Sequence, residues 1–195
     1  ALIAAMTMTC GYLAALVQDN VVRLLAYSSI AQAGYFLLGM VAVGVSSLAF
    51  ESMVVFAAAY VAMNLGAFAV VMRVGRTLDA FSGIGRANPV LGVAMVVFLL
   101  SLTGIPPLAG FVGKFLLFAA SIDASFTWLV VVAILNSVLS LAVYLRIVVS
   151  MYRQGDSVGA TGLTPMPLVT LVGATAFAFT LGIGLAAQVL LNQLN

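Results

Sequence analysis

Long apolar runs, separated by short polar connections, make up most of the chain. The runs are continuous, and most approach the length of about 20 residues that crosses a hydrocarbon core of about 30 Å. Strands of a transmembrane barrel would instead alternate apolar and polar residues over about ten positions. The pattern therefore predicts an all-α, polytopic membrane protein that forms a single transmembrane domain over residues 1–195. We expect six transmembrane helices, over residues 1–17, 24–46, 52–72, 90–122, 126–150 and 165–191.

Composition supports the membrane assignment and excludes several other classes. Apolar residues make up 65% of the chain and charged residues 6%, whereas about a quarter of a typical soluble domain is charged. The sequence has no histidine and one cysteine, Cys10, in an apolar run. This argues against zinc, haem or iron–sulfur ligation by the chain. The absence of a charge run in the sequence argues against nucleic-acid binding.

Positive charges predict the orientation of the helices. The first, third and fifth connections (18–23, 73–89 and 146–165) contain six arginines: Arg23, Arg73, Arg76, Arg86, Arg146 and Arg153. The other connections and both termini have no lysine or arginine. By the positive-inside rule, these connections face the cytoplasm and both termini face away from it. The sequence begins at Ala1 without a positively charged leader, so we expect an interior cut rather than a signal peptide.

The fourth apolar segment is too long for one helix. The 36 residues between Arg86 and Asp123 would span about 54 Å as a continuous helix. Thr103, Gly104, Pro106 and Pro107 lie near its middle, where two prolines remove amide donors. We therefore predict two half-helices, over 90–103 and 108–122, with an unwound link of the kind that marks ion sites in transporters. The alternative is a helix with a simple proline kink.

Lys114, the only lysine in the chain, lies inside the second half-helix. A charge at this depth is costly and usually faces a bundle interior or water. Loss of water around an amine favours its neutral form. A lysine balanced in this way could take up and release a proton, so Lys114 is the candidate proton-relay residue. The alternative is a long side chain that reaches an interface or a cluster of carbonyl groups.

Other polar residues inside the segments repeat at helical spacing, which places each set on one helix face. The candidates for lining a water path are Ser28, Gln32, Tyr35, Asn64, Asn136, Ser140 and Tyr144. Hydrogen bonds between helices are the alternative explanation for each set. No aspartate or glutamate lies inside a segment, and Glu51 is expected at an interface.

Three stretches closely resemble the antiporter-like subunit N of respiratory complex I. Asn20–Tyr35 reads NVVRLLAYSSIAQAGY, Asn64–Val71 reads NLGAFAVV, and Leu100–Phe115 reads LSLTGIPPLAGFVGKF. The related M-type subunits usually carry glutamate where Lys114 stands. The chain departs from the usual family pattern at Val22, which precedes Arg23 in place of a lysine, and at Gln32, where many members have histidine. Glutamine can hydrogen-bond water but cannot titrate.

The resemblance implies a fragment with about helices nine to fourteen of a longer subunit, including its second inverted repeat. The family's broken helix would be residues 90–122 and its proton-carrying lysine would be Lys114. The implied function is that of a proton-translocating subunit of NADH:quinone oxidoreductase, with quinone reduction elsewhere in the complex driving proton release to the non-cytoplasmic side. The implied location is a bacterial or archaeal plasma membrane.

The same resemblance implies partners and leaves alternatives. Partners would be subunit M on one side, small K-, J- and A-type subunits on the other, the lipid bilayer and the N-terminal half of the same subunit. NADH, FMN, iron–sulfur clusters and quinone would belong to partner subunits, with no cofactor in this chain. The main alternative is a subunit of a Mrp-type cation/proton antiporter. A Schiff base on Lys114 is disfavoured because no carboxylate counter-ion lies in the segments. A packing fragment without a transport role is the remaining alternative.

Overall fold

The computed structural model describes residues 1–153 and 166–193, and within them the chain is helical without a strand. The elements are α1 (Leu2–Leu16), α2 (Val21–Met40), α3 (Leu48–Val74), the 3-10 turn η1 (Asp79–Phe81), α4 (Ile84–Ala87), α5 (Pro89–Thr103), α6 (Ala109–Asp123), α7 (Thr127–Tyr152) and α8 (Pro167–Gln193). The predicted all-α fold is confirmed.

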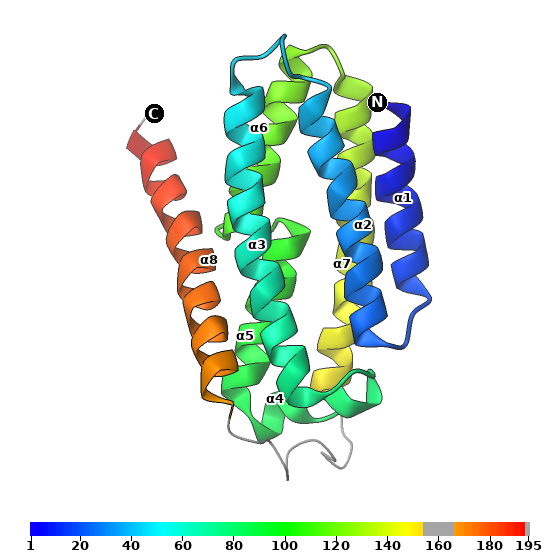
Figure 1. The fold of residues 1–195 in the computed structure, drawn as a ribbon, viewed down its shortest axis with the longest axis vertical. Helices are drawn as coiled ribbons and strands as arrows, with labels where there is room; N and C mark the ends of the chain where they lie inside the picture. Colours follow the sequence, from blue (N-terminus) through cyan, green and yellow to red (C-terminus); the bar gives the residue numbers. More distant parts are fainter. Residues whose placement is uncertain (154–165, 194–195) are drawn as a thin grey trace.

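The long helices run side by side along one axis (Figure 1). α1 packs against α2 and α7 on one side of the bundle, and α8 packs against α3 on the other. The half-helices α5 and α6 follow one another along the same axis, so together they extend from one end of the bundle to the other. The core lies between α2, α3, α6 and α7, where large side chains such as Tyr35, Phe56 and Tyr144 are fully or almost fully buried.

Helix length and composition identify four candidate membrane spans: Val21–Met40, Ala49–Val74, Thr127–Tyr152 and Pro167–Ala186. The candidates become five if Asp79–Ala87 and Pro89–Thr103, a pair bent by 115° at the break between them, count as one span. α1 has 15 residues, as do α5 and α6, and a single helix needs about 20 to cross the core. Length alone therefore does not confirm six crossings, although the α5–α6 pair is long enough as a unit.

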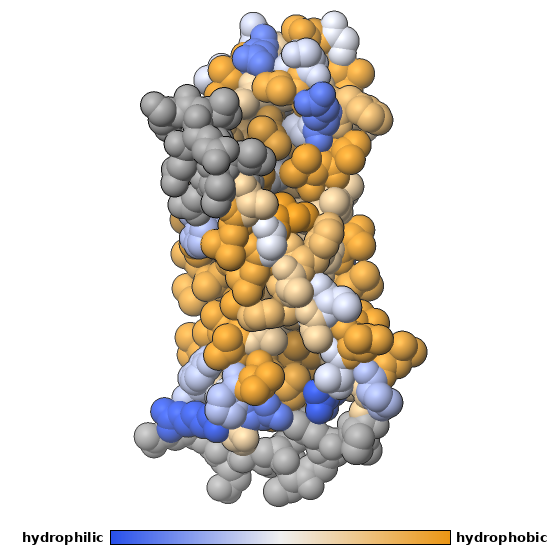
Figure 2. All heavy atoms as spheres, turned by 90° about the vertical axis from the view of Figure 1, so that its left-hand side faces the viewer, coloured by the Kyte–Doolittle hydropathy of each residue, from blue (hydrophilic) through white to orange (hydrophobic). Residues whose placement is uncertain are grey.

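The surface of the bundle matches a bilayer environment. Figure 2 shows an apolar surface along the α8 side, with hydrophilic residues near the two ends of the bundle. Large apolar side chains are exposed on several helices, among them Phe50, Val93, Leu135 and Leu171. Exposed apolar surface of this extent is stable in lipid and would be unfavourable in water. The chain is therefore a multi-pass membrane protein.

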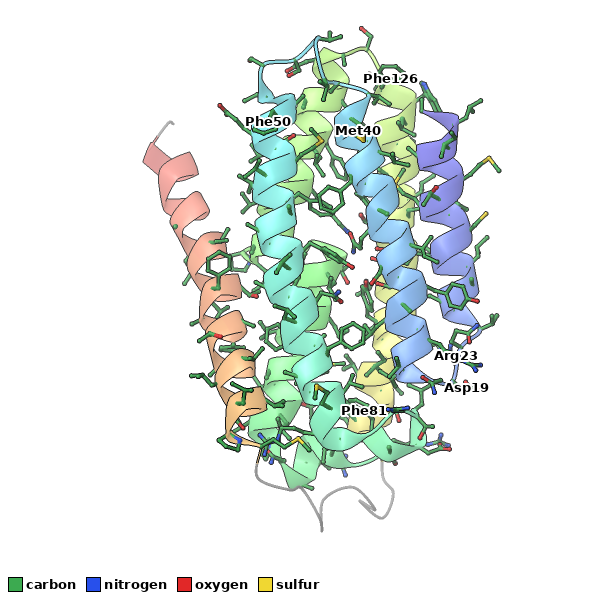
Figure 3. All side chains as sticks on the ribbon, viewed as in Figure 1. Asp19, Arg23, Met40, Phe50, Phe81 and Phe126 are labelled. Carbon is green, nitrogen blue, oxygen red and sulfur yellow. The ribbon has the colours of Figure 1, made fainter. Side chains whose placement is uncertain are left out.

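All six arginines lie at one end of the bundle, where α1, α3 and α7 end and α2 and α5 begin. Figure 3 labels Asp19 and Arg23 at this end and Met40, Phe50 and Phe126 at the other. Arg146 holds the α1–α2 connection by donating to the carbonyl groups of Leu16 and Gln18 and by pairing with Asp19 at 2.8 Å. We call this end the arginine end.

The helix predicted over 24–46 both begins and ends earlier in the structure. α2 begins at Val21, where the Asn20 side chain caps it by accepting from the Arg23 amide, and it ends at Met40. The following residues form a turn through Gly44, whose φ of 84° is readily available only to glycine. Apolar composition alone concealed this turn, because Val41, Val43 and Val45 read as a continuation of the helix.

The connection 73–89 is more ordered than a polar linker. It contains η1 and α4, and main-chain bonds join its start to the α1–α2 connection, from Val21 N–H to Arg76 O (2.7 Å) and from Leu78 N–H to Asp19 O (3.0 Å). The sequence also predicts a linker rich in Gly, Ser, Thr and Pro over residues 154–167, and this stretch lies almost wholly outside the described residues.

Small residues let α1 and α2 approach closely. A Cβ atom on Gly34 would lie 2.8 Å from Met8 N and 3.0 Å from Ala4 O, and one on Gly11 would lie 2.6 Å from Ala31 N. Because lipid supplies little hydrophobic drive for helix association, close backbone packing of this kind is a main source of stability.

We expect Gly34→Leu to force α1 and α2 apart and to lower stability by about 1–3 kcal/mol, the usual cost of overpacking. The measurement is the thermal unfolding midpoint of the detergent-solubilised protein. Gly182→Leu is the matched control, because no other element of the described chain lies within 4 Å of the Cβ position at this α8 glycine. Equal midpoints for the two variants would show that close α1–α2 packing is not needed.

Candidate functional site

The break between α5 and α6 lies at Gly104–Pro107, as predicted. Gly104 closes α5 in the left-handed conformation (φ 94°, ψ 43°), and its N–H donates to the carbonyls of Leu100 and Ser101. Pro106 and Pro107 follow, and α6 begins at Ala109. The break therefore separates two helices with their own termini, which is not the geometry of a simple proline kink.

A side-chain bond fastens the two half-helices to each other. The Ser101 hydroxyl near the end of α5 accepts from the Gly110 N–H in the first turn of α6 (3.1 Å). A Cβ atom on Gly110 would collide with the Ser101 carbonyl. Glycine at 110 thus allows the start of α6 to lie directly against the end of α5.

Lys114 reaches back from α6 onto the carboxyl end of α5. Its Nζ donates to the carbonyls of Leu102 (3.0 Å) and Thr103 (2.9 Å) and lies 3.4 Å from Ser137 Oγ. The side chain is 3% exposed, and Nζ lies 4.4 Å from the centre of the Tyr35 ring. Carbonyls at a helix C-terminus have no intrahelical donor and form the negative end of the helix dipole. A lysine amine is therefore matched to this position.

The lysine contacts carbonyl groups, hydroxyl groups and an aromatic ring. Within residues 1–153 and 166–193, the one ion pair is between Arg146 and Asp19 at the arginine end, so no carboxylate pairs with Lys114 there. The same residues hold no cluster of three His, Cys, Asp or Glu side chains.

Gln32 joins the lysine to a group of tyrosines. Its Nε2 donates to the Leu102 carbonyl (3.1 Å), which Lys114 also contacts, and to Tyr12 Oη (3.0 Å). The Tyr12 ring meets the Tyr144 ring edge-on, with centroids 6.5 Å apart. The Tyr144 hydroxyl in turn lies 2.5 Å from Ser28 Oγ.

Tyr35 and α7 form a second branch. The Tyr35 hydroxyl bonds to the Ala133 carbonyl (2.8 Å) and to Ser137 Oγ (2.9 Å), and Ser140 donates to the Ser137 carbonyl (2.6 Å). Of the predicted residues, Tyr35 contacts Lys114 directly and Gln32 shares the Leu102 carbonyl with it. The predicted residues Ser28, Ser140 and Tyr144 lie farther along the same chain of contacts. We call all these predicted residues, with Tyr12 and Ser137, the lysine network.

Two predicted residues lie elsewhere. Asn136 donates to Thr9 Oγ1 on α1 (3.0 Å) and to the Val132 carbonyl (2.9 Å). Asn64 donates to Tyr60 Oη on its own helix (3.2 Å). Neither shows a hydrogen bond to the lysine network within the described residues.

The network extends from Lys114 toward the arginine end. Ser28 precedes Tyr35 by seven residues on α2, and Tyr144 follows Ser137 by seven on α7; each interval is about 10 Å along a helix. In the other direction the surroundings of Tyr35 are aromatic. Its ring centroid lies 6.2 Å from the ring centroid of Phe56 and 6.4 Å from that of Phe118. The ring centroids of Phe36 and Phe56 are 4.8 Å apart.

Sequence reasoning missed Tyr12, Ser137 and the Leu102 carbonyl. Tyr12 lies in the first apolar run together with Thr7 and Thr9, and no polar stripe was assigned to that run. Ser137 lies next to Asn136 and was outside the stripe counted from Asn136. A main-chain carbonyl has no sequence signature, although the predicted end of a half-helix near Thr103 implies free carbonyls there.

A family model and the sequence relatives of the chain point to the same protein family. Residues 1–140 match the family model described as "NADH:quinone oxidoreductase/Mrp antiporter, TM". NADH-quinone oxidoreductase subunit N 2 of Sorangium cellulosum is 47% identical over 187 residues, which cover 90% of this chain and 35% of that protein. Subunit N 1 of Streptomyces griseus is 37% identical and is matched over 100% of this chain and 42% of that protein. The chain thus spans about a third to two fifths of the length of these relatives.

Solved structures agree with the sequence relatives. A chain of respiratory complex I from Thermus thermophilus with bound aureothin has a TM-score of 0.84 and 33% identity, covering 98% of this chain and 44% of that chain. A chain of the Mrp complex from Dietzia has a TM-score of 0.78 at 24% identity, which shows a shared fold. With its broken helix and buried lysine, the chain belongs to the family of NADH:quinone oxidoreductase and Mrp antiporter membrane subunits.

Proposed function

We propose that the chain is part of an N-type, proton-translocating membrane subunit of an NADH:quinone oxidoreductase, in which Lys114 takes up and releases protons. The observation that carries this proposal is the position of Lys114. It is a buried amine at a helix break, held by carbonyl and hydroxyl groups rather than by a carboxylate among the described residues. An ion pair would fix the charge of the lysine, whereas dipolar partners allow its charge to change.

The lysine network supplies a proton route between Lys114 and the arginine end. Hydroxyl groups both donate and accept hydrogen bonds, so Tyr12, Tyr144 and Ser28 suit proton passage with bound water. Gln32 Oε1 is buried without a protein donor among the described residues, and a water molecule is the usual partner for such an acceptor. Asn136 Oδ1 is likewise buried without a donor among the described residues, so a second water molecule would bind beside α1 and extend the route.

Release on the other side requires the aromatic side chains Phe36, Phe56 and Phe118 to admit water. By the positive-inside rule the arginine end faces the cytoplasm, so these rings close the route to the non-cytoplasmic side, where both termini would lie. The cluster would then prevent proton leakage until quinone chemistry elsewhere in the complex changes the charge of Lys114.

The names of the relatives support the assignment to an oxidoreductase complex. We propose that the partners are the remaining part of the same subunit, an M-type subunit, small K-, J- and A-type subunits and lipid. NADH, FMN, iron–sulfur clusters and quinone would be bound by other subunits, and this chain would perform no redox chemistry.

Replacing Lys114 tests the relay. We expect both Lys114→Met and Lys114→Arg to lower coupled proton translocation about tenfold or more, since a positioned proton-transfer group contributes about 10²–10⁴-fold. Arginine keeps the charge and can cap the carbonyls of α5, but it does not deprotonate in proteins. The measurement is proton uptake by membrane vesicles driven by NADH, with assembly checked on a native gel.

The two substitutions separate a relay from a structural cap. If Lys114 only satisfies the α5 carbonyls, Lys114→Arg keeps proton translocation while Lys114→Met loses assembly. If Lys114→Met assembles and pumps normally, the relay proposal is wrong.

Gln32 tests the route on the arginine side. We expect Gln32→Leu to slow proton translocation several-fold, because leucine cannot bridge the Leu102 carbonyl and Tyr12. Gln18→Leu makes the same chemical change in the α1–α2 connection, where the side chain donates to the Ala14 carbonyl of α1 and to no other group among the described residues. Vesicle proton uptake should be unchanged in that control, and equal rates for the two variants would remove Gln32 from the route.

Co-migration on a native gel separates the oxidoreductase from the antiporter function. The fold shared with the Mrp complex from Dietzia favours a cation/proton antiporter as the second candidate. In gently solubilised membranes, we expect an antibody to this chain to detect a large band that stains for NADH oxidation. A smaller, unstained band would favour the antiporter, and cation-dependent proton flux in vesicles would then be measured.

A further inference from the structure

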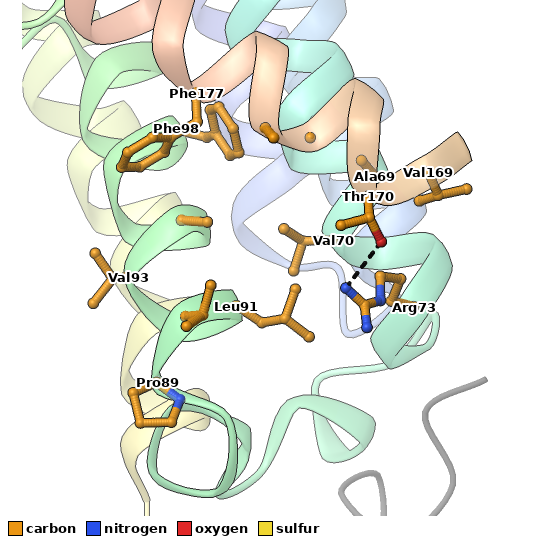
Figure 4. Close-up of a pocket in the computed structure, with 14 residues that line it drawn as sticks. Ala69, Val70, Arg73, Pro89, Leu91, Val93, Phe98, Val169, Thr170 and Phe177 are labelled. Carbon is orange, nitrogen blue, oxygen red and sulfur yellow. Dashed lines mark hydrogen bonds between the residues drawn. The ribbon is translucent and has the colours of Figure 1, made fainter. Parts of the chain in front are cut away.

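A groove of about 550 Å³ runs between α5 and α8, with α3 as its floor. Its walls are almost entirely apolar, and small residues keep it open: Ala69, Ala94, Gly173 and Ala174. Figure 4 shows Phe98 and Phe177 at its inner end and Pro89 and Arg73 at its mouth. The two phenyl rings meet edge-on with centroids 6.0 Å apart, which closes the groove toward the centre of the bundle.

The mouth of the groove is positively charged. Arg73, in the last turn of α3, is the one charged side chain among the described residues that line the groove. Its Nη1 donates to Thr170 Oγ1 at 3.4 Å, and its buried Nε has no hydrogen-bond acceptor among the described residues. A buried guanidinium N–H without an acceptor is costly, so we expect an acceptor for the Arg73 Nε–H beyond the described residues.

Two helix N-termini converge on the same mouth. Pro89 and Val90 begin α5, Val169 and Thr170 lie in the first turn of α8, and all four line the groove. The first amides of a helix lack intrahelical acceptors and form the positive end of its dipole, which favours an anion. In α5, Pro89 has no amide N–H and the Asn88 side chain accepts from the Leu91 N–H at 3.2 Å, so the Val90 N–H is the amide of this turn without an acceptor among the described residues. The guanidinium and the two helix ends are therefore all complementary to one negatively charged group.

We propose that this groove binds an anionic phospholipid from the leaflet at the arginine end. The phosphate lies at Arg73 and the helix N-termini, and an acyl chain extends along α5 and α8 toward Phe98 and Phe177. The shape matches an amphiphile, since charge is confined to the mouth and the interior is apolar over about 10 Å, the length of α8 from Thr170 to Phe177. Basic pockets between transmembrane helices are known settings for such headgroups.

The occupant can be identified by photocrosslinking in the assembled complex. Phe177 is replaced by p-benzoylphenylalanine, the complex is reconstituted in vesicles of equal phosphatidylglycerol and phosphatidylcholine, and adducts are identified by mass spectrometry after irradiation. We expect lipid adducts with about a fivefold preference for phosphatidylglycerol, the effect of one basic residue near an anionic headgroup. Adducts to a peptide would show that a protein segment fills the groove and would overturn the proposal.

Three further variants locate the preference. Arg73→Gln should bring the ratio of the two lipid adducts close to one, while Arg153→Gln, at the same end but outside the groove, should leave it near fivefold. Ala174→Leu, on an exposed wall position, should reduce both adducts by filling the groove. Equal adducts of the two lipids in the otherwise unchanged protein, or an unchanged ratio in Arg73→Gln, would overturn the proposal. These readouts do not depend on proton translocation, so they hold or fail separately from the relay.

Discussion

The contact between Lys114 and the last carbonyls of α5 is the interaction on which the rest of the site depends. A helix that ends inside a membrane leaves carbonyl groups without donors where no bulk water can satisfy them. Gly104 and the following main chain satisfy Leu100 and Ser101, and Lys114 satisfies Leu102 and Thr103. The broken helix and the buried amine thus stabilise each other: the amine caps the carboxyl end of α5, and the break gives the amine polar partners at membrane depth.

The surroundings of this contact are asymmetric. Toward the arginine end, Gln32, Tyr12, Tyr144 and Ser28 present groups that can pass hydrogen bonds, and the Leu102 carbonyl is shared by Gln32 and Lys114. Toward the other end, the neighbours of Tyr35 are phenyl rings. A change in the charge of Lys114 would therefore be felt unequally on its two sides. Such an asymmetry is what a directional proton carrier needs, because access from both sides at once would be a leak.

Much of this arrangement is readable from the sequence because membranes impose strong rules. Continuous apolar runs, two adjacent prolines and one lysine were enough to predict the helical fold, the break at Gly104–Pro107 and the burial of Lys114. Helix ends were less predictable, as the turn through Gly44 shows, since lipid-facing valines look alike in a helix and in the turn after it. The partners of Lys114 were least predictable. They are two main-chain carbonyls and a serine on α7, and side-chain periodicity carries no information about a main-chain group on another helix.

The two ends of α5 differ in how well their charge is matched. At the carboxyl end, the dipole is negative and Lys114 supplies a positive group. At the amino end the dipole is positive, and the start of α8 adds a second positive dipole. The side chain at this place is Arg73, which adds a like charge instead of the opposite one. Arg73 lies in the last turn of α3, and the negative end of that helix dipole offsets part of its charge. The amino ends of α5 and α8 remain positive, and no acidic side chain is among the described residues that line the groove. The same electrostatic argument that explains why a lysine stands at one end of α5 is the basis for the lipid phosphate that we propose at the other.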